Sequence, residues 1–184
     1  MSTSSVEFDP QDPVASFAST WRRIIFDPVG FFGALPPAGG LEPPLAFAAI
    51  CLAIGGVEFV VFYHGVGLKG MIGLVVLGLV RLFIGSAIVA FVAQRIFDGH
   101  GDYEATFRSL AYTSAVAVAI GIPLVKYFAA IYGAYMTIVA LARAHAFDNT
   151  RAFLTLVATA FVGFVVVHAL GLWHLARAVN PLFR

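Results

Sequence analysis

Apolar residues dominate the chain from Pro44 to Ala176, and only four short polar breaks interrupt them. Each segment between breaks is long enough to cross a bilayer, because about 20 apolar residues in a helix span the hydrocarbon core. The pattern therefore predicts an all-α polytopic membrane protein, a bundle of five transmembrane helices in a domain covering residues 44–184. The expected spans are residues 44–64, 70–97, 103–122, 123–144 and 151–176. Between the third and fourth spans, Gly121-Ile122-Pro123 predicts a tight antiparallel connection.

The N-terminal segment, residues 1–43, contains one predicted helix. Asp12 followed by proline supplies an N-cap and a favourable first helical residue. Apolar residues then recur at helical spacing to about residue 26, which predicts a short amphipathic helix over residues 13–26. Its basic and aromatic residues suit the lipid headgroup level; they are Trp21, Arg22 and Arg23. The alternative is a helix packed on its own bundle.

Asp27-Pro28 is interpreted as the end of that helix. The following stretch, Val29 to Pro43, is rich in proline and glycine, and predicts a turn-rich linker into the membrane.

Composition agrees with a membrane protein. Hydrophobic residues make up 60% of the chain and charged residues 11%, against about 25% charged in soluble domains. The net charge of +1 excludes the basic surface that nucleic-acid binding requires. The only cysteine, Cys51, cannot form an intramolecular disulfide. The first residues lack a basic and then apolar signal peptide, so we expect the first span to stay in the mature protein.

Basic residues near the span ends predict the orientation. A cytoplasmic N-terminus would place six of them on the cytoplasmic side: Arg22, Arg23, Arg95, Arg108, Arg143 and Arg151. It would place four on the far side: Lys69, Lys126, Arg177 and Arg184. We therefore expect a cytoplasmic N-terminus and a C-terminus on the far side.

Two charged residues lie inside predicted spans. Arg81 is about eleven residues into the second span, where a lone arginine costs roughly 2.5–3.5 kcal/mol on insertion scales. Glu58 in the first span is the expected partner, although antiparallel neighbours would leave an axial offset of roughly 8 Å. A structural ion pair, a polar site in a cavity for a lipid headgroup or an ion, and an Arg81 that reaches one membrane surface all remain open.

Small residues recur on the third and fourth predicted helices at spacings of four. They are Ala111, Ala115 and Ala119 on the third, and Ala129 and Gly133 on the fourth. Such stripes let helices approach closely in a membrane. We expect these helices to pack together, within one molecule or across a dimer.

No pattern of residues predicts catalysis. The five histidines lack metal-ligand spacing. The stretch from Asp98 to Glu104 holds three carboxylates and two glycines, too few ligands for a calcium loop, and is interpreted as a solvated turn. We expect neither an enzyme nor a bound metal or cofactor.

Two segments carry a family resemblance. The first is Trp21-Arg-Arg-Ile-Ile-Phe-Asp-Pro28 with the following Phe31-Phe32, and the second runs from Gly99 to Tyr112. With five closely spaced spans, they resemble the Yip1-domain membrane proteins of bacterial type. The resemblance implies a five-helix fold in a bacterial inner membrane and a non-enzymatic role in membrane organisation or trafficking. The Asp-Leu-Tyr-Gly-Pro type motif of eukaryotic members is absent, so Rab GTPase binding is doubtful here.

We therefore expect a membrane-organising or scaffold protein whose partners are membrane lipids and a second copy or another membrane protein. The alternative is a small transporter, channel or lipid-handling protein with Glu58 and Arg81 along its pathway. A membrane-embedded enzyme would need a catalytic set of residues that the sequence does not contain.

Overall fold

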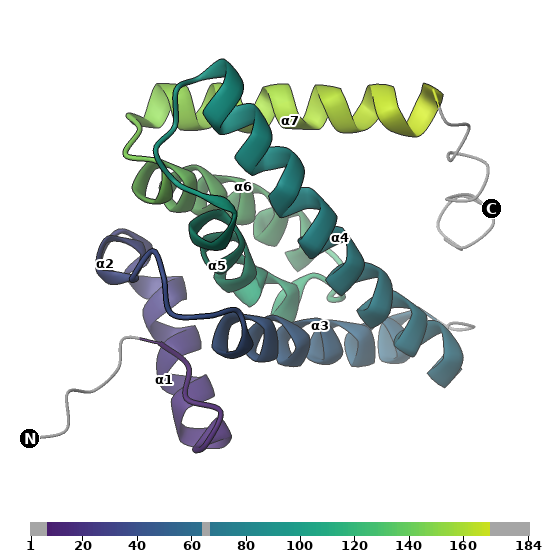
Figure 1. Cartoon of the computed structure of the whole chain (residues 1–184). Coiled ribbons are helices and arrows are strands. Elements are labelled where there is room, and N and C mark those ends of the chain that lie inside the picture. Colours follow the sequence, from purple (N-terminus) through teal and green to yellow (C-terminus); the bar gives the residue numbers. More distant parts are fainter. Residues whose placement is uncertain (1–6, 64–66, 170–184) are drawn as a thin grey trace, which may run out of the picture.

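The computed structural model describes residues 7–63 and 67–169, and in these ranges the chain is helical without a strand. This confirms the predicted all-α class. In chain order the elements are α1 (Pro13–Phe26), α2 (Pro28–Ala34), α3 (Glu42–Phe62), α4 (Gly67–Ile96), α5 (Tyr103–Thr113), the 3-10 helix η1 (Ser114–Ala119), α6 (Val125–Ala144) and α7 (Asn149–Ala169). Figure 1 shows them as one bundle with α1 and α2 at one end.

Among the described residues, four helices are long and apolar enough to cross a membrane: α3, α4, α6 and the Asn149–Val166 part of α7. They correspond to the first, second, fourth and fifth predicted spans, although residues 170–176 of the last lie outside the described part. At 30 residues, α4 is about 45 Å long, more than the roughly 30 Å hydrocarbon core. It runs obliquely to α3 and α7 (Figure 1).

The third predicted span, residues 103–122, is not one continuous helix. The α-helix α5 ends after 11 residues and gives way to the six residues of η1. At the junction, the Thr113 hydroxyl donates to the Leu110 carbonyl at 2.7 Å, a local bond that competes with the regular helical pattern. The expected continuous helix is wrong, and helix length and composition do not confirm a count of five spans.

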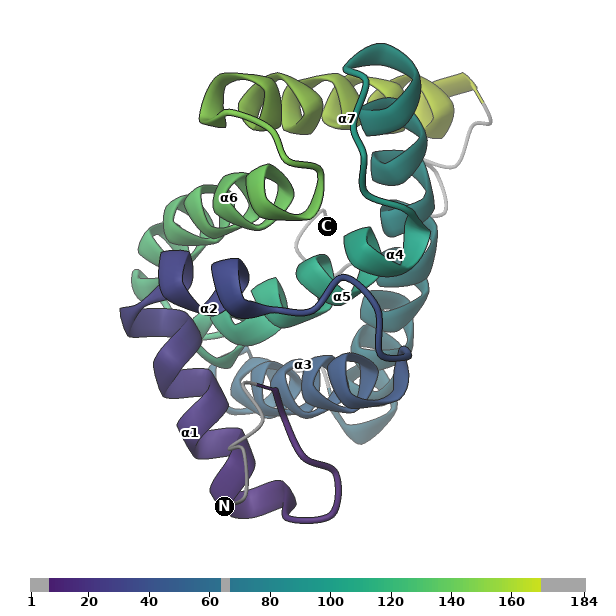
Figure 2. The same cartoon turned by 60° about the vertical axis from the view of Figure 1, so that its left-hand side comes forward.

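The short helix α5 lies in the middle of the bundle. It packs against α3, α4 and α6, and Figure 2 shows it between them. Seven of its 11 residues are buried: Ala105, Thr106, Phe107, Arg108, Ser109, Ala111 and Tyr112. Because other helices cover it, the buried polar residues Thr106, Arg108 and Ser109 of α5 face protein.

Residues 7–41, which we call the N-terminal cap, fold onto one end of the bundle. Phe31 of α2 packs edge-on against Tyr112 of α5, with ring centroids 5.1 Å apart, and Phe47 of α3 lies 5.2 Å from Tyr112. The expected linker is thus partly helical. The Asp27 carboxylate accepts from the Gly30 N–H at 2.9 Å and caps α2. The Asp-Pro pair interpreted as a helix end therefore also begins a helix.

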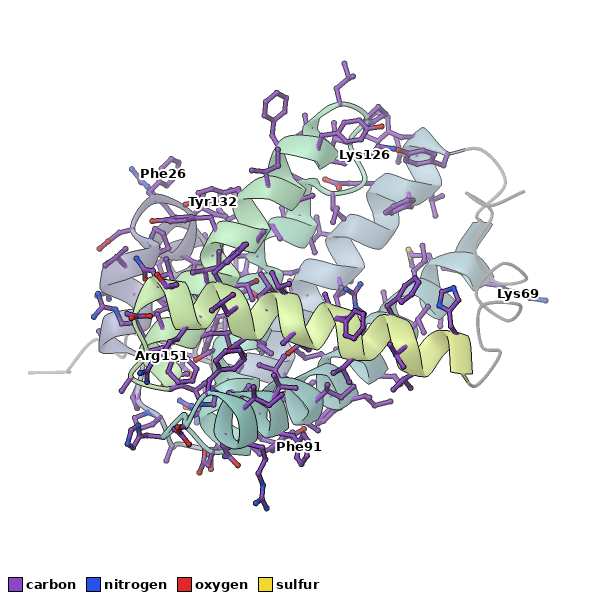
Figure 3. All side chains as sticks on the ribbon, turned by 90° about the horizontal axis from the view of Figure 1, so that it is seen from above. Phe26, Lys69, Phe91, Lys126, Tyr132 and Arg151 are labelled. Atoms are coloured by element: carbon purple, nitrogen blue, oxygen red, sulfur yellow. The ribbon has the colours of Figure 1, made fainter. Side chains whose placement is uncertain are left out.

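The outward faces of the long helices are apolar. Large exposed side chains include Phe91 of α4, Phe128 and Ile131 of α6, and Phe161 of α7, with exposed fractions of 62–74%. Figure 3 shows such side chains all round the bundle. Contiguous exposed apolar surface marks contact with a partner or a membrane, and on helices of this length it indicates lipid contact.

Candidate functional site

Arg108 of α5 is a buried cation that joins the bundle to the N-terminal cap. Its side chain is 1% exposed. Nε donates to the Pro36 carbonyl at 3.1 Å, one terminal nitrogen donates to the Gly40 carbonyl, and the other forms an ion pair with Glu7. Buried charges are stable only when paired and hydrogen-bonded, and Arg108 meets both conditions through residues of the cap.

Glu104 lies one turn before Arg108 on the same helix and holds the same part of the cap. Its Oε1 accepts from the backbone N–H groups of Gly39 and Gly40, at 2.8 and 2.7 Å. Both glycines have positive φ, at 149° and 85°, which favours glycine. A Cβ on Gly39 would lie 3.1 Å from a terminal nitrogen of Arg108. Glu104 and Arg108 are four residues apart and so lie on one face of α5. Glu104 accepts from the N–H groups of the Gly39-Gly40 turn, and Arg108 donates to the Gly40 carbonyl of the same turn.

The Glu7 carboxylate completes this arrangement. One oxygen pairs with Arg108, and the other accepts from the Tyr112 hydroxyl at 3.5 Å. Burial raises the pKa of Glu7, while the positive charge of Arg108 opposes that rise. We call Glu7, Gly39, Gly40, Glu104 and Arg108 the cap clamp.

Next to the cap clamp, His145 is held as a neutral ring. The Thr106 hydroxyl donates to the Asp102 carbonyl at 2.7 Å, so His145 Nε2, 2.9 Å away, must donate to Thr106 Oγ1. Its Nδ1 has no hydrogen-bond partner in the described residues and faces Gly99 and Gly101, where a Cβ would come within 3.0 Å. Burial lowers the pKa of His145 to about 4.

The predicted interfacial residues divide into two groups. Trp21 donates from Nε1 to the Ala115 carbonyl of η1 at 2.9 Å, whereas Arg22 and Arg23 are exposed. From α6, the Tyr132 hydroxyl donates to the Ile25 carbonyl near the end of α1 at 2.6 Å, and Figure 3 shows Tyr132 at the end of the molecule that carries Phe26. These contacts support the alternative in which α1 packs on its own bundle.

Glu58 and Arg81 form no ion pair in the part of the chain that the structure describes. Glu58 instead accepts from the Gly121 N–H at 2.9 Å. Arg81 is exposed and lines a cavity of about 260 Å³ between α3, α4 and η1, together with Gly55, Gly78 and Ala117. The pairing of the two charges therefore stays a prediction without a contact to support it.

The small residues lie where α5 and η1 meet their neighbours. Ala111 and Ala115 are fully buried, and Ala129 of α6 is 9% exposed. Ala119 is half-buried. A Cβ on Gly133 of α6 would lie 3.1 Å from the Val116 side chain. These contacts lie within one molecule.

The cap clamp holds the N-terminal cap against the bundle. Its groups are a guanidinium, two carboxylates and backbone amides, all engaged with one another. Among the described residues, no group of three or more His, Cys, Asp or Glu side chains is placed to hold a metal ion. The arrangement can hold a carboxylate and a turn of backbone against the bundle.

Sequence reasoning missed this site. Arg108 was counted only as an orientation charge, and Glu104 was assigned to a solvated turn. Asp98, His100 and Asp102 in that turn are exposed, as expected, whereas Gly101 is buried and Glu104 holds the cap. A signal was present, since Glu104 and Arg108 are four apart in a predicted helix and such a pair lies on one face.

Comparison with known proteins gives one family. The model of the Yip1 domain matches residues 18–170, which includes α2 to α7 and most of α1. No curated protein and no solved structure matches the chain. The matched region contains Glu104, Arg108 and the Gly39-Gly40 turn, while Glu7 precedes it. With the family model covering most of its length, the chain belongs to the Yip1-domain family and is an integral membrane protein.

Proposed function

We propose that this protein is a non-enzymatic membrane-organising scaffold of the bacterial inner membrane, in a structural or trafficking-like role. The observation that carries the proposal is that its buried charges hold parts of the chain together. Arg108 and Glu7 pair with each other and fasten the cap to the bundle, while the outward surface of α3, α4, α6 and α7 is apolar. Such a molecule offers lipid or another membrane helix a broad contact surface.

The proposal includes a fifth crossing made by α5 and η1. Eleven α-helical and six 3-10 residues together rise about 28 Å, close to the roughly 30 Å of the hydrocarbon core. Burial among α3, α4 and α6 would spare the charged residues of α5 from lipid. With this crossing, the cap and the α4–α5 and α6–α7 connections share one side.

That side is proposed to be cytoplasmic, since Arg95, Arg143 and Arg151 belong to it with Arg22 and Arg23, against Lys69 and Lys126 on the other. Figure 3 labels Arg151 and Lys69 at opposite ends of the molecule. Single cysteines can test both points. Cys51 is buried, so an impermeant maleimide should label Asp98→Cys only from the cytoplasmic side and Leu124→Cys only from the far side. Labelling of both from one side would exclude the fifth crossing.

Self-association tests the scaffold role. Val14 of α1 is 82% exposed, so Val14→Cys accepts a donor or acceptor dye without disturbing the core. Energy transfer between labelled copies in liposomes should persist as lipid is added and fall when unlabelled protein competes. Transfer that disappears on dilution, with no other membrane protein captured by cross-linking in native membranes, would refute the scaffold.

A second candidate, a lipid-handling protein or small transporter, is favoured by one observation. Arg81 lines the cavity of about 260 Å³ between α3, α4 and η1 and makes no ion pair among the described residues. This function predicts lipid translocation or solute flux in liposomes that is lost in Arg81→Leu while the folded protein remains intact. Flux equal to that of protein-free liposomes would refute it.

A further inference from the structure

Two consecutive residues of the N-terminal cap, Glu7 and Phe8, occupy one site on the bundle beside Arg108. The Glu7 carboxylate lies against Arg108 and Tyr112. The Phe8 ring is 3% exposed and lies 6.1 Å from the ring of Phe47, between centroids. The bundle thus offers a charged position and an apolar position side by side, and two adjacent residues of one segment occupy them.

A short turn connects these two residues to the rest of the cap. The Asp9 N–H donates to the Ser16 hydroxyl at 3.1 Å, that hydroxyl donates to the Asp9 carbonyl at 2.9 Å, and the Gln11 N–H donates to the Asp9 carboxylate at 2.9 Å. These bonds are exposed, and they join Asp9 to Gln11 and to Ser16 of α1 without involving Glu7 or Phe8. Departure of Glu7 and Phe8 would therefore break none of them.

Without Glu7, the site would have a defined chemistry. Arg108 would keep its bonds to the Pro36 and Gly40 carbonyls but would lack an anion, and a buried unpaired cation is strongly unfavourable. The planar guanidinium favours a carboxylate. Beside it, the place of Phe8 is lined by Phe47, whose ring also packs on Phe17 at 5.2 Å. The Glu7 side chain is 15% exposed, so the site reaches the surface.

From this geometry we infer that the site formed by Arg108, Tyr112 and Phe47 is an exchangeable peptide-binding site. It takes a segment of a partner protein with a carboxylate residue followed by an aromatic one, and Glu7-Phe8 occupies it in this structure. The inference goes beyond the proposed function, because it holds whether or not the protein associates with itself. A partner peptide can bind only the molecules that Glu7-Phe8 has left. Its apparent affinity therefore equals the intrinsic affinity multiplied by the fraction of molecules whose site is free.

The test uses the full-length protein in nanodiscs and a synthetic peptide of residues 7–12 with 4-fluorophenylalanine at the phenylalanine position. Binding is followed by fluorine NMR. Phe8→Ala and Glu7→Gln, which each weaken the internal occupant, should bind the peptide about tenfold more tightly than wild type or more. Asp12→Asn is the matched control, since it removes an exposed carboxylate of the same segment and should bind as wild type does.

Three further measurements decide the chemistry. Arg108→Gln added to Phe8→Ala should abolish binding, and so should E7Q in the peptide. Equal affinity for the E7Q peptide would overturn the role of the carboxylate, and displacement of the peptide by millimolar inorganic phosphate would assign the site to a phosphate group instead. If neither Phe8→Ala nor Glu7→Gln gains affinity while melting as a folded protein, Glu7-Phe8 is a fixed part of the fold and the inference is wrong.

Discussion

Replacement of Arg108 should destabilise the protein more than any single change on its surface. Arg108→Gln removes the ion pair with Glu7 and at least one bond to the Pro36 or Gly40 carbonyl. Removal of one partner of a buried ion pair costs about 3–5 kcal/mol. Because Glu7 keeps 15% exposure and can regain some water, the expected loss lies at the lower end, about 3 kcal/mol.

Arg108→Lys should cost about half as much. A lysine ammonium can keep the charge pair with Glu7, but as a compact point charge it cannot bond in one plane with both carbonyls. Unfolding by sodium dodecyl sulfate in mixed micelles gives the free energies of wild type and variants. A cycle with Glu7→Gln isolates the pair, and we expect a coupling of about 1.5–3 kcal/mol, the range for hydrogen bonds to charged groups.

Two results would contradict this reasoning. A loss below about 1 kcal/mol for Arg108→Gln would mean that the clamp contributes no more than a typical neutral hydrogen bond. Additive effects of Arg108→Gln and Glu7→Gln would mean that the two side chains do not interact, whatever each contributes alone.

Three other perturbations give independent checks. Trp21→Phe should lose about 1 kcal/mol in the same unfolding assay, since it leaves a carbonyl of η1 without its donor; a loss near zero would place α1 off the bundle. Gly55→Ala should lose about 1–3 kcal/mol because its Cβ would lie 2.4 Å from a backbone oxygen, whereas Gly73→Ala, with nothing within 4 Å, should lose nothing. The pKa of His145 falls from 6.5 to about 4 in the fold, so between these values the unfolded chain binds a proton that the buried ring does not. The free energy of unfolding should therefore be highest above about pH 6.5 and should fall toward pH 4, by up to about 3 kcal/mol. His145→Gln should remove that part of the pH dependence, and an unchanged profile would contradict the assignment of a buried neutral ring.

Hydropathy predicted the four long helices, but it failed on residues 103–122, which form α5 and η1 rather than one continuous helix. The helices α3, α4 and α6 must be apolar around most of their circumference, so their length appears directly in the sequence. In contrast, α5 is enclosed by protein and can carry Glu104 and Arg108. It ends at Thr113, where a hydroxyl bonds a carbonyl of its own helix, and a count of apolar residues does not detect this end.

The cap clamp could not be located from the sequence because its contacts are remote along the chain. Glu7 and Arg108 are 101 positions apart, and Glu104 and Gly40 are 64 apart. Only local parts of the site had a signal, namely the i, i+4 pair on α5 and the Gly39-Gly40 turn. The prediction paired Glu58 with Arg81 because both stand out in apolar spans, whereas in the structure Glu58 satisfies a backbone N–H.

These separations along the chain also determine when the contacts of the cap clamp can form during synthesis. Ribosomes synthesise chains at about 5–20 residues per second. Arg108 is therefore made several seconds after Glu7 and the Gly39-Gly40 turn. During that interval α3 and α4 are already made, and the aromatic side chains of the cap have no α5 against which to pack. A nascent chain arrested before α5 should therefore expose its cap to proteases and chaperones, while one arrested after α6 should protect it.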